Sequence, residues 1–111
     1  MNKLILTADS KHDLAEIKRY ITDQLQNSGA ALRIIASITR ELRTLRPYPQ
    51  MGRSLEADLG VDGYRMLVCG KYLAFYRING NEVQVDRILY GRRDYLAMLF
   101  GDEMEEEDGA E

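Results

Sequence analysis

The stretch that decides the fold is YLAFYRINGNEVQVDRILY, residues 72–90, in which two β-rich runs are joined by the dipeptide Asn79-Gly80. Asn-Gly between such runs is a strong short-range signal for a β-hairpin, typical of a type I′ turn with positive φ at both central residues. A third β-rich run, residues 64–68, comes before the turn Cys69-Gly70-Lys71. We therefore predict an antiparallel meander of three strands, at residues 64–68, 72–78 and 82–90.

The first half of the chain predicts a strand and a pair of helices. The apolar run at residues 3–7 is short and bounded by polar residues, as expected of a strand. Two helices should follow at residues 11–26 and 30–45, because apolar side chains recur there at helical spacing. These side chains are Leu14, Ile17, Ile21 and Leu25 in the first helix, and Ala31, Ile34, Ile35, Ile38, Leu42 and Leu45 in the second.

The ends of the two helices carry recognisable signals. Ser10 is expected to cap the first helix, with Asp13 three residues on, close to a capping-box spacing. Ser28-Gly29 interrupts the pattern between the helices. Pro47 and Pro49 end the second helix, because proline lacks an amide proton and restricts the residue before it. A polar connection then runs to about Gly63.

These elements predict an α+β fold of two layers with the order β-α-α-β-β-β, and residues 93–100 could add a short last helix before Gly101. The helix hairpin must bury its apolar stripe, and one face of an antiparallel sheet is the only large apolar surface available. The other sheet face is then left open. We expect a functional site on that open face, around Arg65.

Composition narrows the class of protein. The chain has 111 residues, 45% of them apolar, which fits one domain over residues 1–101. Residues 102–111 hold seven acids and should form a disordered tail. Residues 1–101 hold all 15 Lys and Arg and the other 11 acids, so this part of the chain has a net charge of +4. Such a charge suits an acidic partner or a nucleic acid. A solvated surface is the alternative.

The single Cys, the single His and the N-terminal sequence argue against disulfide-bonded, metal-binding, secreted and membrane proteins. Cys69 has no second cysteine to pair with, and His12 is the only other soft metal ligand, so neither a disulfide nor a structural metal is expected. His12 should be exposed or act as a cap, and no functional role is expected for it. The sequence shows neither a membrane span nor a signal peptide, which predicts a cytoplasmic protein without a cofactor.

Over about residues 2–101 the chain resembles the RelE/ParE superfamily, the toxins of bacterial toxin-antitoxin pairs. The resemblance rests on the order and spacing of four segments: Pro49 to Arg53 (PQMGR), Gly63 to Arg65 (GYR), Gly70 to Ile78 (GKYLAFYRI) and Val83 to Tyr95 (VQVDRILYGRRDY). It implies a growth inhibitor that is silenced by a cognate antitoxin, an acidic and partly disordered protein. RelE-like members cut messenger RNA on the ribosome, whereas ParE-like members inhibit DNA gyrase.

Leu73 separates these two possibilities. RelE-like nucleases usually carry an arginine at this position to hold the scissile phosphate, and leucine cannot do so. Tyr90 stands where many relatives have histidine, and Leu99 where RelE has a tyrosine. The GKYLAFYR segment is closer to ParE-like sequences, which have an apolar residue at the same place.

Three residues remain candidates for catalysis: Arg65, Arg93 and Tyr90. The arginines could hold a phosphate, but each could equally pair with a carboxylate on the surface. Tyr90 could donate a proton, or simply end a strand as a half-buried aromatic. Candidates for contacting a target or RNA are Arg53, Lys71, Arg87 and Arg92.

Three functions are therefore open. The favoured one is a gyrase inhibitor of the ParE kind. The second is a ribosome-dependent ribonuclease with an altered site, and the third is a module that keeps the fold for binding or regulation without toxicity.

Overall fold

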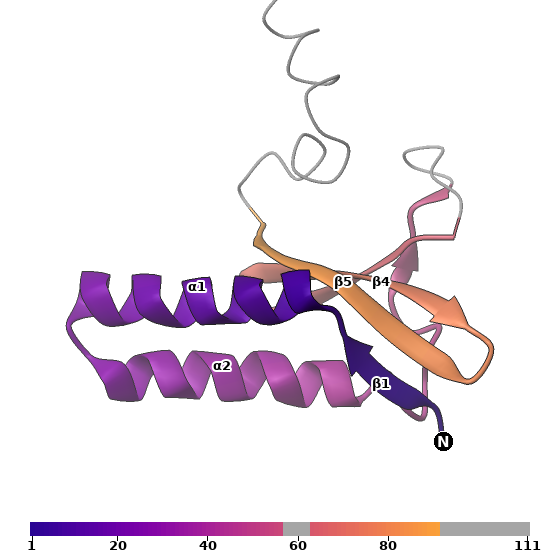
Figure 1. Cartoon of the computed structure of the whole chain (residues 1–111), viewed down its shortest axis with the longest axis horizontal. Helices are drawn as coiled ribbons and strands as arrows, with labels where there is room; N and C mark the ends of the chain where they lie inside the picture. The colour runs from indigo at the N-terminus through magenta and orange to yellow at the C-terminus, as the bar shows by residue number, and fades with distance from the viewer. Residues whose placement is uncertain (57–62, 92–111) are drawn as a thin grey trace, which may run out of the picture.

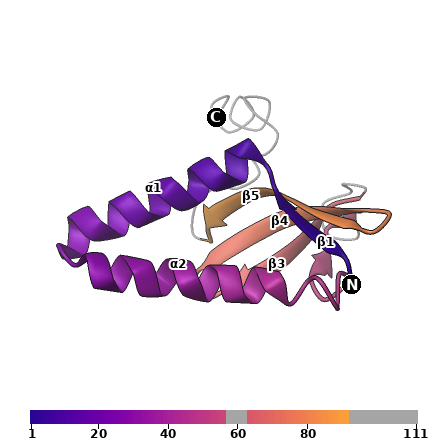
Figure 2. The same ribbon diagram turned by 60° about the horizontal axis from the view of Figure 1, so that its bottom comes forward.

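A computed structural model describes residues 1–56 and 63–91, in which two antiparallel helices lie against one face of a twisted sheet (Figures 1 and 2). The elements in chain order are β1 (Lys3–Leu6), α1 (Ala8–Leu25), α2 (Ser28–Arg43), β2 (Arg53–Ser54), β3 (Arg65–Cys69), β4 (Tyr72–Asn79) and β5 (Glu82–Tyr90). The predicted order of strand, helix hairpin and meander is confirmed. The predicted last helix, residues 93–100, and the tail lie outside the described residues.

Helix α1 begins earlier than predicted, and Ser10 is not its cap. Thr7 is the N-cap, and its hydroxyl oxygen accepts from the Ser10 amide at 3.1 Å. The Thr7 hydroxyl also lies 3.1 Å from the Asp86 carbonyl, to which it donates. Ser10 instead lies inside the helix, fully buried, and donates to the Thr7 carbonyl at 3.0 Å. Tertiary contact with β5 thus decides between two residues that could both cap a helix.

The five strands form one mixed sheet in the order β1-β5-β4-β3-β2. The meander β3-β4-β5 is antiparallel as predicted, but β1 pairs in parallel with β5, so the sheet is not antiparallel throughout. An apolar run predicts that a segment is a strand but does not indicate which strand it pairs with. The sequence therefore did not predict the parallel pairing of β1 with β5. The connection after α2 also contributes a short unpredicted strand, β2, which pairs with β3.

Both hairpin turns place glycine at the first of two central residues. Gly70 and Gly80 have φ of +63° and +60°, and no non-glycine residue near them has positive φ. In the second hairpin Asn79 still pairs with Glu82, so the turn residues are Gly80-Asn81 rather than Asn79-Gly80. Positive φ at the first position alone is typical of a type II′ turn, not of the type I′ turn expected from Asn-Gly.

The main core fills the space between the helices and the sheet. It contains Ile38, Leu42 and Leu45 from the α2 side together with Leu67, Cys69, Ala74, Tyr76, Val83, Val85 and Ile88 from the strands. The opposite sheet face is not the bare surface that we expected. Phe75, Leu89 and Leu55 form a second buried cluster, with Tyr64, Met66 and Leu73 packed against it.

No helix in the described part of the chain is both long enough and apolar enough to cross a membrane.

Candidate functional site

The segment after α2, residues 47–52, is a loop bonded to the sheet by two side chains. The phenol oxygen of Tyr76, in the middle of β4, accepts from the Gly52 amide at 2.9 Å and donates to the Pro49 carbonyl at 2.7 Å. Tyr76 is fully buried, so these two bonds form away from water. A Cβ on Gly52 would stand 2.5 Å from the same phenol oxygen, which is why only glycine fits there.

Arg65 holds the same loop from β3. Its Nε and Nη2 donate to the Gly52 carbonyl at 3.1 and 2.7 Å, and Nη2 also donates to the Gln50 carbonyl at 3.0 Å. Arg65 pairs with Tyr76 across the β3–β4 ladder, so its side chain leaves the sheet on the helix face. The expectation that Arg65 lies on the open face is therefore wrong, because the strand register places it on the other side.

The anchored loop displays apolar side chains to solvent. Tyr48 and Met51 are 67% and 47% exposed. Together with Pro47, Pro49 and Gln50 they line a shallow hollow of about 610 Å³. The exposed apolar groups thus sit on a backbone that Tyr76 and Arg65 fix, which makes this surface rigid before any partner arrives.

Arg87 is tied to the first helix. Its Nε and a terminal nitrogen donate to the two carboxylate oxygens of Asp13 at 2.8 and 2.9 Å, and the Ile88 amide donates to the same carboxylate at 2.9 Å. Asp13 is only 8% exposed. The hydrogen bond to Asp13 is the main reason that the pKa of Arg87 is raised. This clasp fastens α1 to β5 beyond the end of β1.

A polar network that the sequence did not predict lies on β4 and β5 near the turn that joins them. Arg77 donates from Nε to Asp86 at 2.8 Å, and its guanidinium carbon lies 5.3 Å from the centre of the Tyr64 ring. Gln84 donates to Asp86 at 2.8 Å. Burial and the nearby Asp86 raise the pKa of Tyr64, while Arg77 opposes the shift. Alternation along the strands could have placed Tyr64 and Arg77 on the same face, but no sequence signal pairs them.

The remaining predicted residues are spread around the sheet. Tyr90 is half-buried at the end of β5 and packs edge-on against Tyr72, with ring centres 5.7 Å apart. Lys71 is exposed in the β3–β4 turn, and Arg53 is exposed on β2. Arg92 and Arg93 lie outside the described residues.

The structure does not bring Arg65 and Tyr90 together. Arg65 pairs with Tyr76, and Tyr90 pairs with Tyr72. The two partner positions are therefore four residues apart on β4, about 13 Å along the strand. Leu73, which pairs with Leu89, packs against the apolar cluster on the face opposite the helices.

The family described as the ParE toxin of type II toxin-antitoxin systems, parDE, matches residues 4–95. The chain belongs to this family. A solved structure described as the chromosomal ParDE TA system from P. aeruginosa is similar, with a TM-score of 0.70 and 25% sequence identity. The match covers 81% of this chain and 96% of that chain. Among curated proteins, none matches the chain.

Membership of the ParE toxin family confirms the resemblance drawn from the four segments. The matched range includes all of the described strands and helices after Lys3. It also includes the anchored loop, the Asp13–Arg87 clasp and Leu73, so these features belong to the ParE-like domain itself.

Proposed function

We propose that this ParE-family toxin arrests growth by inhibiting DNA gyrase as a binding protein, without nuclease chemistry. The observation that carries the proposal is that two candidate cations are engaged within the molecule and that the expected phosphate-binding position is apolar. Arg65 is bonded to loop carbonyls, Arg87 is paired with Asp13, and Leu73 lies in an apolar cluster. RNA cleavage needs cations that can meet the developing phosphate charge at one point, together with an acid or base within reach.

The separation of Arg65 from Tyr90 supports the same proposal. Groups that act on one phosphate must lie within hydrogen-bond reach of it, about 3 Å from the reacting atoms. The backbone positions of Arg65 and Tyr90 are about 13 Å apart along the sheet. Arg65 is also bonded to loop carbonyls, and Tyr90 packs on Tyr72, so neither side chain is directed at a shared target.

Two assays with purified protein test the target. A supercoiling assay should show inhibition of gyrase, and translating ribosomes should yield no codon-positioned messenger cleavage. Arg65→Lys is the matched variant for both assays, because it keeps the charge but lacks the planar fork that holds two carbonyls. Robust cleavage that Arg65→Ala abolishes would identify a ribonuclease and overturn the proposal.

We also propose that a cognate antitoxin neutralises the toxin and contacts the hollow on the anchored loop. A partly disordered antitoxin must offset the cost of ordering its chain, which requires apolar contact in addition to charge pairs. Tyr48 and Met51 offer such contact on a fixed backbone. Arg46, which precedes Pro47 in the chain and is exposed, offers a positive charge to an acidic partner near this hollow.

Coexpression tests the antitoxin proposal. Expression of the toxin alone should arrest growth, and coexpression of the adjacent antitoxin gene should restore it. Tyr48→Ser should weaken the complex by about tenfold or more, as expected when an aromatic anchor is lost. Tyr20→Ser is the control, because Tyr20 is 64% exposed on α1, away from the hollow. Equal binding by both variants would place the antitoxin elsewhere.

A further inference from the structure

Helix α2 carries a row of arginines that neither the fold nor the proposed site uses. Between Asp23 and Glu56 the chain has five arginines and a single acid, Glu41. Three of the arginines, Arg33, Arg40 and Arg43, lie on α2, and all three are exposed. We call these three residues the α2 row.

The α2 row occupies one stripe of the helix. Positions 33, 36, 40 and 43 follow one another at spacings of three, four and three, which keeps them on the same face. Between the arginines the stripe contains Ala36, a small exposed residue, and half-buried Ser37 lies beside it. Glu41 follows Arg40 directly and is therefore turned about 100° away from the row.

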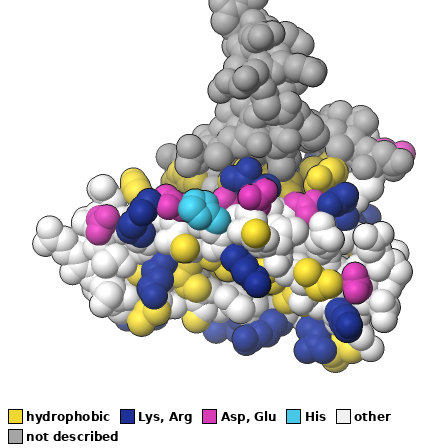
Figure 3. All heavy atoms as spheres, viewed as in Figure 1, with side chains coloured by type: hydrophobic (Ala, Val, Ile, Leu, Met, Phe, Trp, Pro, Cys, Tyr) yellow, Lys and Arg dark blue, Asp and Glu magenta, His cyan; other side chains and the backbone are white. Residues whose placement is uncertain are grey.

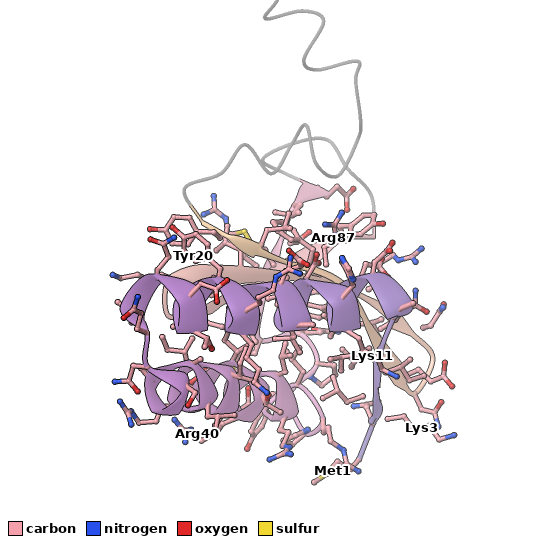
Figure 4. All side chains as sticks on the ribbon, turned by 60° about the vertical axis from the view of Figure 1, so that its left-hand side comes forward. Met1, Lys3, Lys11, Tyr20, Arg40 and Arg87 are labelled. Atoms are coloured by element: carbon pink, nitrogen blue, oxygen red, sulfur yellow. The ribbon has the colours of Figure 1, made fainter. Side chains whose placement is uncertain are left out.

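The row faces away from the rest of the hairpin. Arg40 lies on the side of α2 away from α1, whereas Arg87 lies beyond α1 (Figure 4). In the space-filling view, Lys and Arg side chains gather along the lower edge of the molecule, on the α2 side (Figure 3). Lys3, Arg43 and Arg46 continue this surface around a shallow hollow of about 390 Å³ beside β1.

Internal contacts do not account for the row. Across residues 1–56 and 63–91, the ion pairs that the structure shows involve His12, Arg19, Arg77 and Arg87 but no member of the row. The helix dipole favours Arg40 and Arg43, which stand in the last turn. It does not favour Arg33, which stands near the start of α2.

We propose that the α2 row binds the phosphodiester backbone of a nucleic-acid duplex. Arginine offers a planar fork that matches phosphate oxygens, and here all three positions are arginine. Arg33 and Arg43 stand about 15 Å apart along the axis, at 1.5 Å per residue. That span is comparable to the ~12 Å width of the major groove of DNA, so a helix laid across the groove reaches phosphates on both sides.

An acidic protein segment fits the row less well. A segment that folds on binding needs broad apolar surface, and the row offers only Ala36 between its arginines and Leu32, 54% exposed, beside them. Phosphate contacts require no apolar surface, because the release of counterions supplies most of the binding free energy. The contact with nucleic acid does not depend on which target the toxin inhibits.

Fluorescence anisotropy with a labelled 20-base-pair duplex tests the proposal. The triple variant R33Q/R40Q/R43Q is compared with K11Q/K18Q/R19Q, which loses the same charge from exposed side chains of α1. Circular dichroism and thermal melting should be unchanged in both variants. Duplex DNA and duplex RNA of the same sequence are used in parallel, and the ratio of the two affinities names the preferred duplex.

The salt dependence is the decisive readout. If each arginine of the row neutralises one phosphate, the slope of log affinity against log salt should become shallower by about 3 in the row variant. The row variant should then bind at least ~10-fold more weakly at ~0.1 M salt, while the α1 variant keeps most of its affinity. Equal losses in both variants would show that only overall charge matters, and would overturn the proposal.

A competition assay distinguishes a surface that binds nucleic acid from one that binds acidic protein. Heparin should displace the duplex, and polyglutamate of equal charge should displace it poorly. If polyglutamate binds the wild type as tightly as the duplex does, and the row variant loses both alike, the surface recognises acidic protein and the proposal fails. Loss of duplex binding leaves gyrase inhibition measurable on its own, so the two proposals can fail separately.

Discussion

Helices α1 and α2 are similar in length, 18 and 16 residues, and they pack against the same sheet, but they carry their charges differently. Helix α1 has four acids against three Lys and Arg, and two of the acids are in ion pairs. Asp13 holds Arg87, and Glu16 holds Arg19 at 2.6 Å. Helix α2 has three arginines against one acid, and the ion pairs that the structure shows include none of them.

The difference lies in how each helix uses its charges. In α1, Asp13 fastens the helix to β5, and Glu16 pairs with Arg19 within the helix. The arginines of α2 are exposed to solvent, as the proposed contact with nucleic acid requires. The comparison can be tested by measuring how substitutions on each helix change the packing of that helix against the sheet and the free energy of unfolding.

The largest expected effect is on the rate at which a thiol reagent labels Cys69, which lies between α2 and the sheet. Cys69 is buried under α2, beside Glu41, and burial raises the pKa of its thiol to about 12. At about pH 8 this shift alone lowers the thiolate fraction about 10³-fold relative to a free cysteine. Labelling by a thiol reagent should therefore be very slow in the native protein and fast in denaturant. Rapid labelling under native conditions would mean that α2 lifts readily from β3.

The same thiol gives a pH dependence with a defined sign. Its pKa is higher in the folded protein than in the unfolded chain, so the unfolded chain ionises first as the pH rises. The contribution to the free energy of unfolding is complete below about pH 9 and is lost between about pH 9 and 12. Cys69→Ala should show less of this loss in alkaline denaturation curves.

Asp13→Ala should destabilise the fold by about 3 to 5 kcal/mol, because it leaves the Arg87 guanidinium and the Ile88 amide without their acceptor. Urea unfolding measures the change. Asp23→Ala, an exposed acid on the same helix, is the control and should cost less than about 0.5 kcal/mol. Similar losses for both would mean that the clasp does not hold α1 in place.

On the inner side of α2, Ile38→Ala should cost about 2 to 4 kcal/mol through lost burial and a residual cavity. Leu32→Ala removes a comparable side chain from a position that is 54% exposed, and should change stability little. A loss below about 0.5 kcal/mol at Ile38 would place it outside the core.

The smallest effect is expected at the surface pair of α1. Glu16→Ala breaks the contact with Arg19, but both side chains are largely exposed, so the loss should be about 0.5 kcal/mol or less and should vanish in high salt. A loss above 1 kcal/mol that persists in ~1 M salt would show that surface charges on α1 matter more than its clasp.

Much of the fold could be predicted because local signals agreed with the tertiary structure. Gly70 and Gly80 mark both turns of the meander, and the stripe through Ile38 and Leu42 marks the buried side of α2. The errors came where a distant partner decided the outcome. Thr7 outcompetes Ser10 as the cap because its hydroxyl reaches Asp86, and the neighbour of β1 lies almost 80 residues away.

The candidate site was harder to predict for the same reason. Sequence identifies Arg65 and Arg87 as cations, but it cannot say whether a guanidinium meets a ligand phosphate, a loop carbonyl or a carboxylate. Arg65 meets the Gly52 carbonyl, and Arg87 meets Asp13, 74 positions earlier in the chain. Leu73 was informative because an apolar side chain is excluded from holding phosphate wherever it lies.

The parallel pairing of β1 with β5 also constrains how the toxin is made. Lys3 pairs with Glu82 and Leu6 with Val85, so the first strand waits for its neighbour until most of the chain has been synthesised. At about 5 to 20 residues per second, that delay is on the order of ten seconds. Pairing of such distant segments also slows folding itself. A nascent chain therefore lacks the β1–β5 pair throughout most of its own translation, so the sheet can be completed only after residue 85 has left the ribosome.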